Sequence, residues 1–308
     1  MTVLDAIGHT PLVELQRLPP PGAARVLVKL EFANPTGSMK DRMAVAAIDA
    51  AEADGRLKPG GTVVEYTGGT TGVSLAFVCA AKGYKARIVF SDAFSQDKRL
   101  MMEALGAEVS LVRSGGSGIT EKVVRQMIEE ARTLGGRPGH WWCDQLNNRD
   151  AIAGYVPLGE EIRQQAGRVD AFVHCVGTAH SIHGATRGLR KGGAVHVVAV
   201  EPAESAVLAG GPAGSHGIDG IGIGFVPPLW EPHEVNELMT VSTADAKAMA
   251  RRLAAEEGVF AGTSSGANVV AALRVARRLG TGATVATIMV DSGLRYVSTD
   301  VFLKETRP

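Results

Sequence analysis

The sequence predicts an α/β protein in which mostly parallel sheets carry helices on both faces. Short runs rich in β-branched and apolar residues alternate with runs of helical periodicity along most of the 308 residues. Two such series occur, one before and one after about residue 147, which suggests two α/β domains. A cleft between two domains of this kind is a common place for a cofactor.

The first series begins with an apolar strand at 26–31. Further strands are expected at 62–66, 86–90 and 108–112, with helices at 71–82 and 96–105 between them. A helix at 121–134 is amphipathic, and the side chains on its apolar face are Val123, Val124, Met127, Ile128 and Ala131.

The second series begins with a helix at 151–167 that contains a proline. Strands are expected at 170–176, 195–201 and 284–290, and helices at 181–190, 243–257 and 265–279. The long glycine-rich loop 209–224 is of the kind that is often functional or mobile.

Composition excludes several classes of function. Apolar residues make up 45% of the chain, charged residues 21%, and the formal net charge is zero, so nothing favours nucleic acid or an anionic membrane as a partner. No apolar run reaches the length of a membrane span, and the N-terminus is no signal peptide. Cys79, Cys143 and Cys175 follow no pattern, so we expect buried free thiols in a reducing cytoplasm and no metal site.

Lys40 is the first candidate for chemistry. It lies in the segment 34–42 (NPTGSMKDR), directly after the expected strand at 26–31. A lysine, an anion-binding turn and a late serine at the start of a helix are what an enzyme that uses pyridoxal 5′-phosphate (PLP) needs. The lysine forms the Schiff base, the turn holds the phosphate, and the serine meets the pyridine nitrogen. Taken alone, Lys40 would be a surface lysine.

Three polar turns supply the other candidates. The turn 177–181 (GTAHS) follows an expected buried strand and opens a helix, so its amides and hydroxyls suit a phosphate. The turn 67–72 (TGGTTG) has the same context and suits a carboxylate, and 263–266 (TSSG) also opens a helix. Each one alone has a structural explanation as a tight turn or a helix cap. Together with Lys40, in this order, they point to a site.

The chain resembles the cysteine synthase (O-acetylserine sulfhydrylase) and cystathionine β-synthase family of PLP enzymes, the fold-type II group. The similarity runs nearly from end to end. The segments that carry it are 7–13 (IGHTPLV), 31–42, 65–72 (EYTGGTTG, where the family has EPTSGNTG), 144–148 (DQLNN), 177–181 (GTAHS, where the family has GTGG and then Thr or Ser), 220–227 (GIGIGFVP), Ser264 and 295–299 (RYVST).

The resemblance implies a role for each matching residue. Lys40 would hold the cofactor and act as the catalytic base. The other residues that would bind PLP are Thr70, Gly177, Thr178, Ala179, His180, Ser181 and Ser264. Those that would bind the substrate are Thr67, Gly68, Gly69, Thr71, Gln145 and Gly222. The resemblance also implies a tryptophan-synthase-β-like pair of three-layer domains: a large PLP-binding domain (1–36 plus 148–308) and a small, mobile substrate-binding domain (37–147). A cytoplasmic homodimer is expected.

Four departures from the family pattern bear on the reaction. Thr70 replaces an asparagine that hydrogen-bonds O3′ of the cofactor, and Gly68 replaces a serine. Ala179 and His180 replace two glycines of the phosphate loop. His180 adds a donor or fills the pocket wall, unless His180 and His183 pack outward on the helix.

The function implied is β-replacement on an O-activated L-serine, most simply O-acetyl-L-serine plus sulfide giving L-cysteine through an α-aminoacrylate. Three alternatives stay open. The same first half-reaction can end in elimination, as in a cysteine desulfhydrase. Another nucleophile can give cystathionine or a different β-substituted alanine. A PLP-binding regulatory homologue without turnover is the non-enzymatic alternative. The sequence does not assign the leaving group, the nucleophile or a regulatory partner.

Overall fold

The computed structural model describes residues 1–116 and 120–302, and over these it is an α/β protein, as predicted. The chain divides into two compact units. The first comprises Met1–Ile7 and Lys40–Gly154, and the second comprises Gly8–Met39 and Tyr155–Pro308. Each unit contains one sheet. The predicted roles of a PLP-binding and a mobile substrate-binding domain, with divisions at 36/37 and 147/148, stay predictions.

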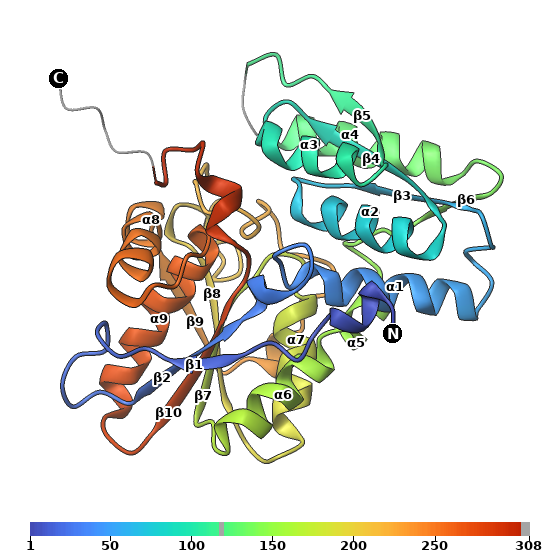
Figure 1. The fold of residues 1–308 in the computed structure, drawn as a ribbon. Helices are drawn as coiled ribbons and strands as arrows, with labels where there is room; N and C mark the ends of the chain where they lie inside the picture. The colour runs from blue at the N-terminus through green and yellow to red at the C-terminus, as the bar shows by residue number, and fades with distance from the viewer. Residues whose placement is uncertain (117–119, 303–308) are drawn as a thin grey trace. The chain divides into compact units, whose positions relative to one another are not determined.

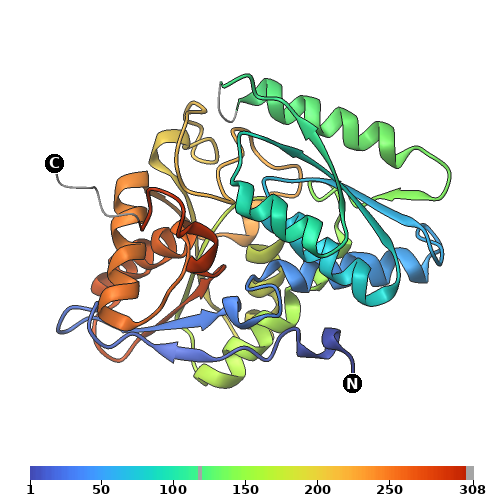
Figure 2. The same ribbon diagram turned by 45° about the horizontal axis from the view of Figure 1, so that its top comes forward.

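The first unit is built on a wholly parallel sheet with the strand order β5-β4-β3-β6. Helix α4 lies on one face of this sheet, and α2 and α3 lie on the other, with α1 packed on α2 (Figures 1 and 2). Its elements are η1 (Val3–Ala6), α1 (Lys40–Ala53), β3 (Thr62–Tyr66), α2 (Thr70–Lys82), β4 (Lys85–Ser91), α3 (Gln96–Ala104), β5 (Glu108–Val112), α4 (Glu121–Gly135), β6 (His140–Trp142) and α5 (Asp150–Ala153).

The second unit has a sheet with the order β1-β2-β10-β7-β8-β9, in which only the β1–β2 pair is antiparallel among the described residues. Helices α8 and α9 cover one face and α6 and α7 the other (Figure 1). Its elements are β1 (Leu12–Glu14), β2 (Arg25–Leu30), η2 (Glu31–Ala33), α6 (Val156–Ala166), β7 (Ala171–Cys175), α7 (His180–Arg190), β8 (His196–Pro202), η3 (Ala203–Ser205), η4 (Pro232–Glu234), β9 (Glu237–Val241), α8 (Thr243–Arg252), η5 (Leu253–Glu257), α9 (Thr263–Leu279), β10 (Thr284–Met289) and η6 (Gly293–Tyr296).

Most predicted elements lie within a residue or two of the observed ones, and two differ. The helix expected at 243–257 is α-helical only to Arg252 and continues as the π-helix η5. The single helix expected at 151–167 is two helices, α5 and α6, separated at Gly154 and Tyr155. Pro157 is the reason, because a proline has no N–H to donate to the preceding turn and is tolerated in the first turn of a new helix. The short strands β1, β6 and β9 and the helix α1 were not predicted.

Each sheet has a strand at which the chain order reverses. The successors of β3 lie on opposite sides of it, with β4 on one side and β6 on the other. In the second unit β7 lies between β8 and β10. In open parallel sheets ligands bind beyond the carboxyl ends of the strands at such a point. The turns that follow β3 and β7 are the predicted carboxylate and phosphate turns.

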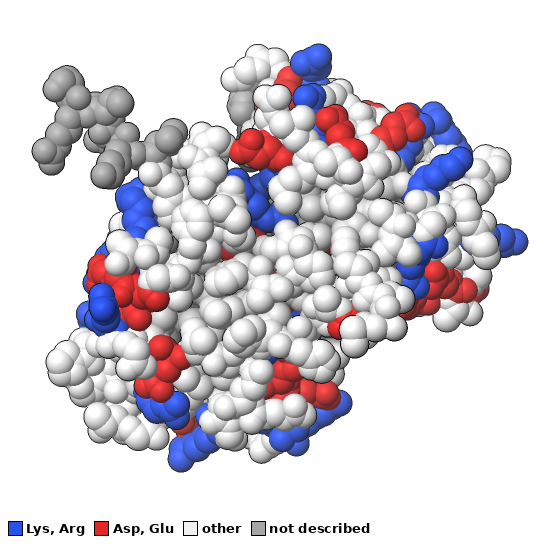
Figure 3. Space-filling view, viewed as in Figure 1, with Lys and Arg blue, Asp and Glu red and all other residues white. Residues whose placement is uncertain are grey.

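Burial agrees with the composition. On α4, Val123, Met127 and Ala131 are buried, as the amphipathic pattern predicted. The three cysteines are free and buried, as expected, and burial raises the pKa of each thiol. Acidic and basic side chains are interspersed on the face shown in Figure 3 rather than gathered by sign. In the part of the chain that the structure describes, no helix is both long and apolar enough to span a membrane.

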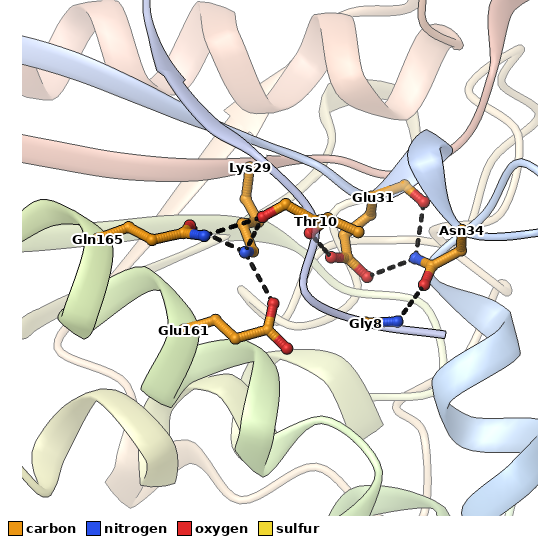
Figure 4. A network of polar contacts seen from close by, with 7 residues as sticks. All are labelled: Gly8, Thr10, Lys29, Glu31, Asn34, Glu161 and Gln165. Atoms are coloured by element: carbon orange, nitrogen blue, oxygen red, sulfur yellow. Dashed lines mark hydrogen bonds and ion pairs between the residues drawn. The ribbon is translucent and has the colours of Figure 1, made fainter. Parts of the chain in front are cut away.

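A buried charge network anchors the N-terminal strands of the second unit (Figure 4). Lys29 on β2 has no exposed side-chain surface, and its Nζ lies 2.8 Å from a carboxylate oxygen of Glu161 on α6. The same Nζ donates to Oε1 of Gln165 at 2.9 Å and to the carbonyl of Thr10. Thr10 in turn donates its hydroxyl to Glu31 at 2.6 Å. The network therefore joins β2, α6 and the segment before β1.

Replacing Lys29 by alanine should destabilise the protein strongly, because the carboxylate of Glu161, which is only 12% exposed, and the carbonyl of the buried Thr10 would lose their cation. We expect a loss of about 3–5 kcal/mol in the free energy of unfolding, measured by urea denaturation. Arg25→Ala is the matched control, since Arg25 lies on the same strand and its ion pair with Glu14 is half exposed. That control should cost under about 1 kcal/mol. Equal losses in the two variants would contradict the assignment.

Candidate active site

Lys40 is the first residue of α1, and the chain passes from the second unit back to the first between Met39 and Lys40. The segment that leads to it is fixed within the second unit. The amide of Met39 donates to the carbonyl of Val290 at 3.0 Å, and the amide of Ser292 donates to that of Gly37 at 2.9 Å. The guanidinium of Arg295 donates to the carbonyl of Thr36. The stretch that follows β10 thus sets where the Lys40 segment leaves the second unit.

The predicted phosphate turn connects β7 to α7. Ala179 has a left-handed backbone (φ +70°), which is unusual for a residue other than glycine and strained for alanine. Among the described residues, the amides of Gly177, Thr178, Ala179 and Ser181 have no acceptor within the protein. Free amides at the start of an eleven-residue helix are suited to bind an anion.

Gly177 is needed because another backbone segment approaches it closely. A Cβ atom at this position would lie 2.4 Å from the carbonyl oxygen of Gly220. Gly222, predicted to bind substrate, belongs to the same approaching segment, and its amide donates to the carbonyl of Val176 at 3.2 Å. Its own carbonyl accepts a hydrogen bond from His216 at 2.8 Å. The segment 220–222 therefore lies directly against the phosphate turn.

Both histidines of α7 point inward, so the alternative that they pack outward is wrong. His180 and His183 have no exposed surface. Nδ1 of His180 lies 2.8 Å from the hydroxyl oxygen of Thr178. His183 lies 2.7 Å from a carboxylate oxygen of Glu234 and accepts from the amide of Glu231, while burial lowers its pKa. The helix packs on α6 and β7, which leaves these faces no contact with solvent.

Ser264 lies in the first turn of α9 and is 2% exposed. Its carbonyl accepts a weak bond from the thiol of Cys175 at 3.4 Å, which ties it to the end of β7. Within the described residues its hydroxyl has no hydrogen-bond partner. A hydroxyl without a protein partner at the start of a helix is available to a ligand atom.

The predicted carboxylate site brings together residues far apart in sequence in the first unit. The Thr71 hydroxyl donates to Oε1 of Gln145 at 2.9 Å, and Nε2 of Gln145 donates to the carbonyl of Tyr66 at 2.7 Å. Thr67 accepts from the amide of Gly69 at 2.9 Å, and Gly69 has a φ of +136°. The Thr71 proton is thus already used to orient Gln145, and the Gly69 amide is used by Thr67. The donors left for a carboxylate are the other turn amides and the second Nε2 proton of Gln145.

Gly68 is explained by a neighbour that the sequence analysis did not select. A Cβ atom on Gly68 would lie 2.9 Å from the ring of Phe94, which also packs against Phe90 at 5.6 Å between ring centroids. A serine here would force the ring to move. Thr70 begins α2, next to Gly69, where the family's asparagine would lie.

Glu65 hydrogen-bonds the backbone on both sides of this site, and it was not among the predicted site residues. Its carboxyl is completely buried and accepts from the amide of Gln145 at 2.9 Å and from that of Tyr66 at 2.9 Å. Burial raises the pKa of Glu65 to about 8, against an ordinary value of 4.5. Glu65 therefore places the backbone of Gln145 while being neutral near pH 7.

Two features of the second unit fit PLP. Free amides lie at the N-terminus of α7 and an unpartnered hydroxyl lies at the N-terminus of α9, both beyond the carboxyl edge of one sheet. Those two groups match the needs of a phosphate and of an uncharged pyridine nitrogen. Among the described residues, Lys40 starts a helix directly after a fixed segment.

Comparisons with known proteins agree. A family model described as "Pyridoxal-phosphate dependent enzyme" matches residues 3–291. A cysteine synthase of Staphylococcus aureus is 40% identical over 304 residues, which are 97% of this chain and 96% of that protein. A solved O-ureido-L-serine synthase has a TM-score of 0.91 and 38% identity, covering 98% of this chain and 94% of that one. The cysteine synthase of Entamoeba histolytica has a TM-score of 0.89 and 36% identity, covering 99% and 92%. The likeness confirms the predicted fold-type II class.

Gly177→Ala should disrupt the phosphate turn, because its Cβ would meet a backbone oxygen rather than a movable side chain. We expect a stability loss of about 1–3 kcal/mol in urea unfolding and weaker PLP binding, followed by cofactor absorbance. Gly136→Ala is the control, since the nearest atoms to a Cβ there are 3.7 Å away. If Gly177→Ala matched the wild type in both measurements, the close approach of segment 220–222 would be refuted.

Glu65 should make stability depend on pH. Its pKa is about 8 when folded and near the ordinary 4.5 when unfolded, so the unfolded state loses its proton first as pH rises. The contribution of Glu65 is therefore most favourable below pH 4.5 and is lost as pH rises to about 8, by up to roughly 1.4 kcal/mol per pH unit. The difference in unfolding free energy between wild type and Glu65→Gln should change accordingly. A difference that is constant with pH would show an unshifted carboxyl.

Proposed function

Since the chain belongs to the family of pyridoxal-phosphate dependent enzymes, alongside the cysteine synthases, we propose that it catalyses β-replacement on an O-activated L-serine. In the simplest form O-acetyl-L-serine and sulfide give L-cysteine and acetate. The observation that carries the proposal is the unpartnered, uncharged hydroxyl of Ser264 at the start of α9. A hydroxyl facing the pyridine nitrogen does not hold a proton there as a carboxylate would, which favours loss and replacement of the β-substituent over transamination.

The bound cofactor supplies an electrophilic carbon for the substrate amine and a ring that accepts electrons released at Cα. The chain's own residues do the rest. Free amides of the turn 177–181 and the Ser181 hydroxyl hold the phosphate. The turn amides after β3 other than that of Gly69, and the second Nε2 proton of Gln145, hold the substrate carboxylate. The amine of Lys40 removes the Cα proton as the general base and returns it to Cα of the product.

A second candidate is β-replacement with a nucleophile other than sulfide. The observation that favours it is the carboxylate turn, where Gly68 stands in place of a serine and the ring of Phe94 fills the space. The similarity to a solved O-ureido-L-serine synthase is in line with it, since the product named there is also a β-substituted alanine. A small-molecule amino-acid substrate is common to both candidates. We further propose a cytoplasmic homodimer.

Purified protein with PLP should form L-cysteine from O-acetyl-L-serine and sulfide, quantified by chromatography. Lys40→Ala should lower the rate by at least about a thousandfold, because the base is lost. Lys58→Ala, an exposed lysine of the same unit, is the control and should keep full activity.

Other products would redirect the proposal. Pyruvate and sulfide released from L-cysteine, with no cysteine formed from O-acetyl-L-serine, would make the protein a desulfhydrase. Consumption of O-acetyl-L-serine only with a different nucleophile would favour the second candidate. Full activity in Lys40→Ala would overturn the role of Lys40.

A further inference from the structure

A histidine lies in β7, a strand of the second unit whose residues are all buried. His174 has no exposed surface, and every other residue of β7 is apolar or a buried thiol. Its Nε2 lies 2.8 Å from the hydroxyl oxygen of Ser181, the last residue of the phosphate turn. A histidine at such a place has to be satisfied by hydrogen bonds, and its partners reveal which nitrogen carries the proton.

The side-chain amide of Asn268 on α9 fixes the other side of the ring. Its Oδ1 accepts from the backbone amide of Cys175 at 2.7 Å, and its Nδ2 donates to the backbone carbonyl of Ile288 at 2.7 Å. Turning the amide over would set N–H against N–H and C=O against C=O. The two strands that flank α9, β7 and β10, therefore allow Asn268 one orientation only.

The orientation of Asn268 determines the tautomer of His174. The second proton of Nδ2 points to Nδ1 of His174 at 3.3 Å, so Nδ1 is the acceptor. A neutral imidazole that accepts at Nδ1 carries its proton at Nε2. Nε2–H then donates to Ser181, and the Ser181 oxygen is an acceptor in that bond.

We infer that His174 is a positioning residue that turns the Ser181 hydroxyl into a hydrogen-bond donor toward the cofactor phosphate. Once the Ser181 oxygen accepts from His174, its own proton is released for another acceptor. Among the described residues the protein offers that proton no acceptor. Phosphate oxygens only accept, so a hydroxyl whose proton pointed at His174 would turn its lone pairs to the anion instead. This inference rests on the proposed assignment of the turn 177–181 to the phosphate.

A second pair lies in the same turn, where the hydroxyl of Thr178 is 2.8 Å from Nδ1 of His180. The pair of His174 and Ser181 is connected through Asn268 to backbone groups whose donor and acceptor roles are fixed. The hydrogen bonds that run from these backbone groups through Asn268 and His174 determine that Ser181 accepts from His174.

The tautomer can be measured in the wild-type holoprotein, with a variant needed only to assign the resonance. Nitrogen-15 NMR of labelled histidine distinguishes a protonated ring nitrogen from an unprotonated one, and the resonance of His174 is assigned by its absence in His174→Gln. We expect a proton on Nε2 and none on Nδ1. A proton on Nδ1, alone or together with Nε2, would overturn the inference.

Binding measurements test whether the tautomer acts on the phosphate. The full-length protein freed of cofactor is titrated with PLP and with pyridoxal, which has the same ring and aldehyde but no phosphate. Ser181→Ala should reduce the preference for PLP over pyridoxal about tenfold, and His174→Phe about three- to tenfold. The double variant should lose no more than Ser181→Ala alone, because His174 acts through Ser181. His174→Gln, whose amide can donate to Ser181, should restore most of the preference.

His196→Phe is the matched control, since His196 lies on the adjacent strand β8 with its side chain 46% exposed. It should change neither affinity. If His174→Phe weakened PLP and pyridoxal equally, His174 would have only a structural role. If Ser181→Ala lost the preference and His174→Phe kept it, the phosphate assignment would stand and the inference would fail. If Ser181→Ala kept the preference, the assignment of Ser181 would fail as well, whatever the activity with O-acetyl-L-serine.

Discussion

The buried side-chain amide of Asn268 is the constraint on which the second unit's site depends. It satisfies one backbone group on each of β7 and β10 from a helix that crosses both, and it completes the hydrogen bonds of His174. A buried amide left without partners costs several kilocalories per mole, so this arrangement holds strands and helix in one register. Ser264 lies one turn before Asn268 on the same face of α9, and its position follows from the same contact.

Both units bury ionisable groups, and Glu65 and Lys29 are examples. In the first unit the Glu65 carboxyl accepts hydrogen bonds from the amides of Tyr66 and Gln145, and burial raises its pKa so that it is neutral near pH 7. In the second, Lys29 stays paired with Glu161 and surrounded by acceptors. Both groups are costly to bury. Glu65 fixes the backbone of Gln145, a predicted substrate-binding residue, and Lys29 fixes the packing of β2 on α6.

The departures from the family pattern have local physical causes. Gly68 has no side chain because the ring of Phe94 occupies the space. Ala179 keeps the left-handed backbone that glycine would adopt without strain, and it is 2% exposed, so only a small side chain fits. His180 replaces a second glycine and turns inward to Thr178 rather than away from the turn. The backbone of the phosphate turn is therefore kept while its side chains differ.

The sequence by itself determined the alternation of strands and helices, the polar turns after β3 and β7, and the family to which the chain belongs. Those features are local, because hydrophobic periodicity, turn residues and motif spacing depend on residues that are close in sequence. The same local patterns missed the break before α6 and the short strands, whose existence depends on pairing with distant segments. Only the tertiary structure selected His174 and Glu65, brought Thr71 to Gln145 across 74 positions, and showed that the Thr71 proton is already used. Hydrogen bonds between residues that are distant in sequence determine which side-chain atoms donate and which accept, and the local sequence pattern does not specify these roles.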